Sequence, residues 1–134
     1  MVDLVLVESV LRLTSLPAGT KTALADAFEE VTVPAGERIV SQGDFAYELF
    51  AILEGTALVE QDGNVVATLG RGDLCGEIGL LLTGRRTAAI VADTPMRLLV
   101  LFDQSFRRIS REHPEFANLV RGESQDRFTR PATI

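Results

Sequence analysis

The sequence is poor in the residues that build disulfides and metal sites. Its 134 residues include one cysteine, one histidine and no tryptophan. A single cysteine excludes an internal disulfide. Together with one histidine it cannot supply a Cys/His zinc cage, nor the paired imidazoles of most catalytic metal sites. We therefore expect no metal, no cofactor and no metalloenzyme chemistry.

Basic residues and long apolar runs are also scarce. Thirteen lysines and arginines face 19 acidic residues, a formal net charge of −6 that disfavours direct binding of nucleic acid. No apolar run reaches the roughly 18 residues that a membrane span requires. Near the start, Asp3 and Glu8 stand where a signal peptide would carry basic residues. We expect a cytoplasmic protein whose direct partners are neither nucleic acid nor membrane.

What remains is the composition of an ordinary soluble domain, with 46 % hydrophobic and 24 % charged residues. The length suits one domain of typical size. We expect that domain to span residues 1–122 and to be followed by a polar tail over residues 123–134. Gly122 is expected to weaken or end the last helix, which argues against a well-formed helical lid in this region.

Helical periodicity is confined to the two ends of the chain. Leu4, Val7 and Leu11 fall on one helical face, and Thr20 is predicted to cap a second helix. A third helix is expected after Asp103 and a fourth from Pro114. His113, just before that proline, is predicted to cap a helix C-terminus or to be exposed.

From Glu30 the apolar period changes to two, and turn residues recur about every 8–12 positions, as in a sandwich or barrel of short antiparallel strands. Asp62-Gly63 is the clearest hairpin, because both residue types tolerate the positive φ of a type I′ turn. Strands are predicted near residues 30–33, 37–41, 48–54, 56–61, 65–69, 86–92 and 96–102. The fold class is therefore mainly β with flanking helices.

The segment from residue 74 to residue 92 carries the chemistry, because its only full charges are Glu77, Arg85 and Arg86. Gly76 precedes a predicted helical turn over residues 77–82 whose first N–H groups lack intrahelical acceptors. Such a turn attracts a small anion, and Gly79 has no Cβ to obstruct the approach. An arginine at the start of the next strand would complete an anion clamp.

Glu77 is badly placed beside a free oxyanion, since like charges repel. A ligand that offers both an anion and a hydroxyl group resolves this conflict, with the carboxylate accepting from the hydroxyl. Thr87 adds a neutral hydroxyl to the same segment. The pattern indicates a sugar phosphate or a nucleotide.

These residues resemble a known cassette. Gly76-Glu77-Ile78-Gly79-Leu80-Leu81, followed by Arg86-Thr87-Ala88, looks like the phosphate-binding cassette of cyclic nucleotide-binding domains. Further similarity, in the family's order, lies in Val33-Pro34-Ala35-Gly36-Glu37, Gln42-Gly43-Asp44, Leu53-Glu54-Gly55 and Gly70-Arg71-Gly72-Asp73. The resemblance covers roughly residues 15–120, and several motifs in series are more specific than any single motif.

The resemblance implies a jelly-roll-like β-roll, an antiparallel double-stranded β-helix, with N-terminal helices, a short cassette helix and C-terminal helices. It implies that Glu77 accepts the ribose 2′-hydroxyl and that Arg86 pairs with the cyclic phosphate. Backbone contacts would come from Gly76, Ile78, Gly79 and Ala88, a phosphate or guanine contact from Thr87, and apolar contacts to the base from Ala67 and Leu69.

Two neighbours of the cassette depart from the family pattern. Cys75 replaces a frequent aromatic residue and is expected in the core. Arg85 stands beside Arg86, so the assignment to Arg86 depends on spacing, and Arg85 is expected on the surface.

The implied function is a non-enzymatic sensor that binds cAMP or cGMP and shifts its C-terminal helices, through which a second copy or an effector protein would dock. Three alternatives stay open. The chain could be a β-roll interaction module that no longer binds nucleotide, the sensor fragment of a larger regulator, or a cupin-like barrel enzyme. The last would need a histidine pair, and the sequence has only His113.

Overall fold

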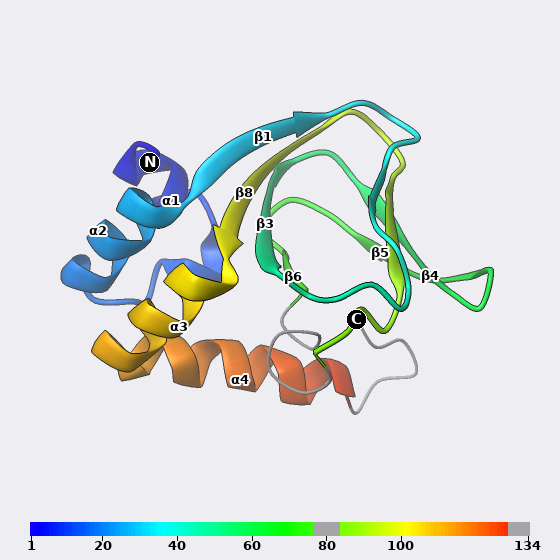
Figure 1. Cartoon of the computed structure of the whole chain (residues 1–134). Helices are drawn as coiled ribbons and strands as arrows, with labels where there is room; N and C mark the ends of the chain where they lie inside the picture. Colours follow the sequence, from blue (N-terminus) through cyan, green and yellow to red (C-terminus); the bar gives the residue numbers. More distant parts are fainter. Residues whose placement is uncertain (77–83, 129–134) are drawn as a thin grey trace.

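Short apolar strands form a β-roll, and helices gather against one side of it (Figure 1). The computed structural model describes residues 1–76 and 84–128. The helices are α1 (Leu4–Glu8), the 3₁₀ helix η1 (Leu11–Leu13), α2 (Ala18–Ala27), α3 (Asp103–Glu112) and α4 (Pro114–Phe128). The strands are β1 (Glu29–Val33), β2 (Arg38–Val40), β3 (Glu48–Glu54), β4 (Ala57–Gln61), β5 (Asn64–Leu69), β6 (Leu74–Cys75), β7 (Ala89–Ala92) and β8 (Met96–Phe102).

The described strands pair into two antiparallel sheets, with strand orders β1-β8-β3-β6 and β2-β7-β4-β5. Because most neighbours in each sheet, β4 and β5 excepted, come from distant parts of the sequence, the chain winds as a roll rather than as a simple meander. The predicted mainly β fold with flanking helices is confirmed.

Strands β3 and β8 are buried on both faces and join two separate cores. Leu49 and Leu101 face a core shared with the helices, which includes Phe106 and Phe116. Phe50 and the other alternate residues of these strands face the core between the two sheets. A strand buried on both faces is continuously apolar, and this explains the unbroken run from Leu98 to Leu101. The two strands therefore fix the helices to the roll.

The predicted Asp62-Gly63 hairpin is present between β4 and β5. Gln61 pairs with Asn64, which leaves a loop of two residues with φ of +53° at Asp62 and +82° at Gly63. Both values are positive, as a type I′ turn requires. The sequence prediction is confirmed here because the backbone preference of Asp-Gly is local, and Gln42 adds two hydrogen bonds to Asp62 from outside the turn.

The strand expected from residue 86 begins only at Ala89. Residues before it are held by a neighbouring loop, since Arg86 N donates to Asp44 O at 2.7 Å and Gly43 N donates to Arg86 O at 2.8 Å. This loop pairing fixes the backbone of Arg86 outside β7. The two-residue strand β6 was not predicted, because it is too short to show a period.

Gly122 was expected to weaken or end the last helix, and the second of these effects is wrong, since α4 continues through it to Phe128. Gly122 is exposed, and a Cβ there would meet nothing within 4 Å. A single exposed glycine costs a helix about 1 kcal/mol relative to alanine, which weakens the helix without breaking it.

Thr20 does not cap α2, which begins at Ala18 after Pro17. Its side chain is fully buried, and Oγ1 lies 3.0 Å from His113 Nδ1 and donates to Glu115 Oε1. His113 is the C-cap residue of α3, as predicted. The three side chains connect α2 to the junction of α3 and α4. The hydrogen bond from Thr20 lowers the pKa of the Glu115 carboxyl below its ordinary value.

At Gly55 the backbone lies very close to the chain at Pro95 and Met96. Its φ is +94°, and a Cβ would lie 2.4 Å from Pro95 O and 2.8 Å from Met96 Cγ. At Gly36 the φ of +87° is similar, but nothing lies within 4 Å. Gly36→Ala should lower the free energy of unfolding by about 1 kcal/mol through backbone strain alone, and Gly55→Ala by at least about 2 kcal/mol more through the clash. Urea denaturation measures both, and equal losses would contradict the close approach.

The Thr20 contact predicts a pH-dependent stability. Because the pKa of Glu115 is lowered in the folded state, the stabilisation is complete above the ordinary glutamate pKa and is lost as pH falls through the folded-state value. Thr20→Val should therefore lower Tm at pH 7 and have a smaller effect at pH 3. Thr22→Val, which removes an exposed hydroxyl of the same helix, is the control. A Thr20→Val effect that is equal at both pH values would contradict the assignment.

Candidate functional site

Arg86 is the only charged residue among the described residues that is buried, with 5 % of its surface exposed. Burial of a guanidinium is costly unless its N–H groups and its charge are paired. Its backbone is fixed by the two hydrogen bonds to the loop at Gly43 and Asp44. The fold therefore holds a positive charge at one defined point beside the roll.

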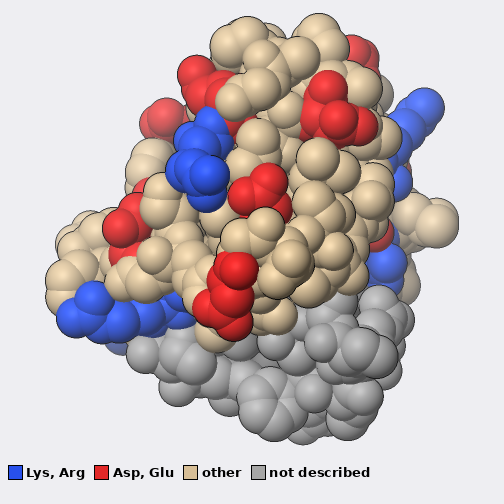
Figure 2. All heavy atoms as spheres, turned by 90° about the vertical axis from the view of Figure 1, so that its right-hand side faces the viewer, with Lys and Arg blue, Asp and Glu red and all other residues tan. Residues whose placement is uncertain are grey.

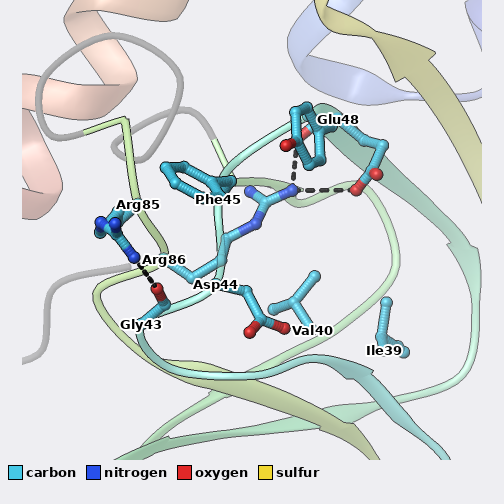
Figure 3. Close-up of a pocket in the computed structure, with 9 residues that line it drawn as sticks. Ile39, Val40, Gly43, Asp44, Phe45, Glu48, Arg85 and Arg86 are labelled. Atoms are coloured by element: carbon cyan, nitrogen blue, oxygen red, sulfur yellow. Dashed lines mark hydrogen bonds and ion pairs between the residues drawn. The ribbon is translucent and has the colours of Figure 1, made fainter.

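The Arg86 guanidinium points toward the start of β3 (Figure 3). Nη2 donates to Glu48 O and to Glu48 Oε2, both at 3.0 Å, and Nη1 donates to Gly76 O at 3.2 Å. The Cζ atom lies 5.5 Å from the centroid of the Phe50 ring. Two carbonyls, one carboxylate and one aromatic face thus surround the cation.

Gly76 is required by the position of that cation. Its φ is +93°, and a Cβ at residue 76 would lie 2.7 Å from Arg86 Nη1 and 2.9 Å from Glu48 O. Any side chain would displace the guanidinium or the strand end. The glycine that the sequence analysis selected as a backbone contact is therefore also the residue that makes room for Arg86.

A cavity of about 460 Å³ opens beside the pair formed by Arg86 and Glu48. Its lining residues are Ile39, Val40, Gly43, Asp44, Phe45, Tyr47, Glu48, Arg85 and Arg86. Arg85 is exposed as predicted and turns away from the guanidinium of Arg86, donating to Gly43 O at 3.0 Å and stacking 4.1 Å from the Phe45 ring centroid. Of the two adjacent arginines, Arg86 alone is buried.

Thr87 and Ala88 follow Arg86 on the way to β7. Thr87 O accepts from Gln61 Nε2 at 3.2 Å, whereas Thr87 Oγ1 is buried and has no hydrogen-bond partner among the described residues. Ala88 is 3 % exposed and packs in the core between the sheets. A buried hydroxyl with no partner is unusual in a native protein and requires a specific explanation.

Ala67 and Leu69 lie on β5, opposite Val59 and Ala57 of β4. Ala67 is half-buried, while Leu69 is buried in the core between the sheets, which also contains Ala88 and Cys75. Neither residue lines the cavity beside Arg86. The structure thus brings Gly76 and Arg86 into contact. Ala67 and Leu69 lie outside the lining of the cavity beside Arg86.

Three predicted site residues, Glu77, Ile78 and Gly79, lie outside the described residues. The expected cassette helix over residues 77–82 falls in the same range.

Sequence reasoning missed Glu48 and Phe45. Glu48 is the only charged residue between Asp44 and Glu54, within the predicted strand 48–54. A lone charge at the start of an apolar strand needs a partner, and that was the available signal. The partner itself lies 38 positions away, and no local pattern identifies it.

Other types of site find little support in the described part of the chain. No group of three or more histidine, cysteine, aspartate or glutamate side chains there could hold a metal ion. No helix among those residues combines the length and the apolar character needed to cross a membrane. Acidic and basic side chains are interspersed on the face shown in Figure 2, which presents no continuous basic surface.

Comparison with known proteins gives one consistent result. Residues 30–113 match the sequence profile of the family described as the cyclic nucleotide-binding domain. The cAMP-dependent protein kinase regulatory subunit of Schizosaccharomyces pombe is 34 % identical over 105 residues, which cover 78 % of this chain and 26 % of the yeast protein. The chain thus spans about a quarter of that relative.

Solved structures share the fold. A putative cyclic nucleotide-binding protein from Geobacter metallireducens superposes with a TM-score of 0.81 at 20 % identity, covering 91 % of this chain and 92 % of that one. The regulatory domain of Toxoplasma gondii PKA, crystallised with cAMP, gives 0.80 at 23 % identity, covering 92 % and 48 %. The Thermus thermophilus catabolite activator protein gives 0.78 at 28 % identity, covering 87 % and 57 %.

The sequence profile covers more than half of the chain, and it includes Arg86, Gly76 and the strands that hold them. The resemblance inferred from the cassette residues is therefore confirmed at the level of the family. This chain belongs to the cyclic nucleotide-binding domain family.

Proposed function

We propose that this domain binds a 3′,5′-cyclic nucleotide, cAMP or cGMP, and acts as a sensor rather than an enzyme. The observation that carries the proposal is Arg86, a buried guanidinium fixed at the edge of a cavity within the family's cassette. A fixed cation with restricted access to water suits a ligand that brings one negative charge, as a cyclic phosphate does.

The resemblance to the family's cassette implies the roles of these residues. Arg86 would pair with the exocyclic oxygens of the cyclic phosphate, and the backbone of Gly76, Ile78, Gly79 and Ala88 would complete the phosphate site. Glu77 would accept the ribose 2′-hydroxyl, which relieves the repulsion that a bare anion would meet there. Membership of the family supports this division of roles.

The residues proposed to contact the base do not select one purine. Thr87 has a buried hydroxyl group that no residue in the described part of the chain hydrogen-bonds, and a phosphate oxygen or a guanine amino group would satisfy it. Ala67 and Leu69 lie on β5 and pack in or against the core between the sheets, and they would contact the base. These residues suit both purines, so the proposal includes cAMP and cGMP alike.

The C-terminal helices are the proposed output. Strand β8 leads directly into α3, whose first residue, Asp103, donates its N–H to Tyr47 O at 2.8 Å, next to Glu48. A ligand that favours one arrangement of α3 and α4 shifts the population toward it by the difference between its two affinities. The helices would then present their surface to a second copy or to an effector protein. The yeast relative, named as a kinase regulatory subunit, supports a regulatory role.

Removal of the guanidinium tests the phosphate contact. Arg86→Ala should weaken binding of cAMP and cGMP about ten- to a hundredfold, because a hydrogen bond to a charged group contributes roughly 1.5–3 kcal/mol. Isothermal titration calorimetry measures the change, with circular dichroism to verify folding. Arg97→Ala, which removes an arginine that does not line the cavity, is the control and should retain the affinity of the wild-type chain. An unchanged affinity in Arg86→Ala would refute the assigned role.

The sugar contact is tested by comparing cyclic nucleotides with and without the 2′-hydroxyl. The wild-type chain should prefer cAMP to 2′-deoxy-cAMP, because only cAMP can donate to Glu77. Glu77→Gln should lose most of this preference, since the carboxylate that accepts the hydroxyl hydrogen is replaced by a neutral amide. Competition titrations give the ratio of the two affinities, and a ratio equal to that of the wild-type chain would show that Glu77 does not bind the sugar.

A further inference from the structure

Glu48 uses the part of Arg86 that a phosphate needs. A guanidinium has five N–H donors, and its two-point contacts with an oxyanion use either Nη1 with Nη2 or Nε with Nη2. In this structure the two Nη2 contacts go to Glu48 O and Glu48 Oε2, both at 3.0 Å. Because both two-point faces include Nη2, each of them already has a donor engaged by Glu48.

Charge adds to this conflict. A phosphate on Arg86 Nη2 would lie next to the Glu48 carboxylate, and two negative charges at that distance repel each other. The phosphate and the carboxylate are thus alternative partners for the same nitrogen. One must leave before the other makes its full set of contacts.

Glu48 is the partner that is able to move. The Arg86 side chain is only 4 % exposed and is held by Gly76 O, whereas the Glu48 side chain is 26 % exposed. Glu48 also lines both the cavity beside Arg86 and a second hollow of about 270 Å³ bounded by Phe50 and Val100. Its carboxylate therefore has space and access to solvent, and its backbone carbonyl stays in the β3 strand.

We propose that the Glu48 carboxylate is a stand-in for the ligand phosphate, that is, the anionic partner of Arg86 that the phosphate replaces on binding. It neutralises Arg86 in the ligand-free domain and yields Nη2 when the nucleotide phosphate arrives. This inference rests on the proposed function and adds a regulating residue to the same site. Glu48 thereby stabilises the ligand-free domain and lowers its affinity for the ligand. Loss of the carboxylate should therefore lower the stability of the domain and raise its affinity for the ligand.

Glu48→Gln separates the two effects, because glutamine has nearly the same size but no charge. Its affinity for cAMP or cGMP, measured by calorimetry, should rise about five- to tenfold, since a neutral amide competes less well for Arg86 than a carboxylate does. The Tm of the ligand-free variant should fall by about 3–5 °C, because the buried guanidinium loses its counter-ion. A merely structural glutamate would not raise the affinity when it is replaced.

Glu30→Gln on β1 is the matched control. Glu30 also accepts two hydrogen bonds from an arginine, Arg97, at 3.1 and 3.2 Å, and 34 % of its side chain is exposed. It does not line the cavity beside Arg86. This control should lower Tm without changing the affinity for either nucleotide.

Each result has a defined meaning. In one outcome the wild-type chain binds nucleotide, Arg86→Ala binds it much more weakly, and Glu48→Gln binds it no more tightly than the wild-type chain. The stand-in role is then overturned and the proposed function stands. If Glu48→Gln binds where the wild-type chain does not, the stand-in role is supported. If neither binds cAMP or cGMP, both proposals fall.

A crystal structure of the wild-type domain with the bound nucleotide covers the case in which Glu48→Gln does not fold. Phosphate oxygen should then take the position of Glu48 Oε2 on Arg86 Nη2, with the carboxylate more than the present 3.0 Å away. Persistence of that contact in the liganded structure overturns the inference.

Discussion

The buried charge of Arg86 is the constraint on which the arrangement of the site depends. A guanidinium held at 5 % exposure must always have an anionic or carbonyl partner, and three neighbouring features meet this requirement. Gly76 has no side chain and so allows close approach, β3 begins with a carboxylate, and the loop at Gly43 and Asp44 fixes the backbone of the arginine. Each of these residues lies in a different part of the sequence, and the roll brings them to one point.

The same strand that supplies the counter-ion also carries both cores. Strand β3 presents Leu49 to the helices and Phe50 to the interior of the roll, and its first residue contacts Arg86. Its partner β8 has two buried faces as well and continues without a break into α3. Arg86, the sheet and the helices are therefore parts of one packed unit. The start of β3 is in direct contact with the start of α3, because Asp103 N donates to Tyr47 O.

Local chemistry determined which features the sequence could predict. The Asp62-Gly63 turn and the main strands follow from short-range patterns, and the structure contains them. The choice of Arg86 over Arg85 came from the resemblance to the family's cassette and stays a prediction, although Arg85 is exposed as expected. Glu48 escaped prediction because its partner is distant in sequence. Thr20 resembled a helix cap, but packing against the junction of α3 and α4 determined its position instead. The helix through Gly122 shows that one unfavourable residue does not set a boundary.

The composition of the chain determines its intrinsic fluorescence. The sequence contains no tryptophan and a single tyrosine, Tyr47, which lines the cavity with 55 % of its surface exposed and is adjacent to Glu48. Ultraviolet emission from the unlabelled protein therefore comes from one phenol at the cavity wall, since phenylalanine contributes little at those wavelengths. Nearby carboxylates and phosphates quench tyrosine emission, and Tyr47 lines the same cavity as Arg86 and Glu48, so its emission is the intrinsic optical signal of that cavity.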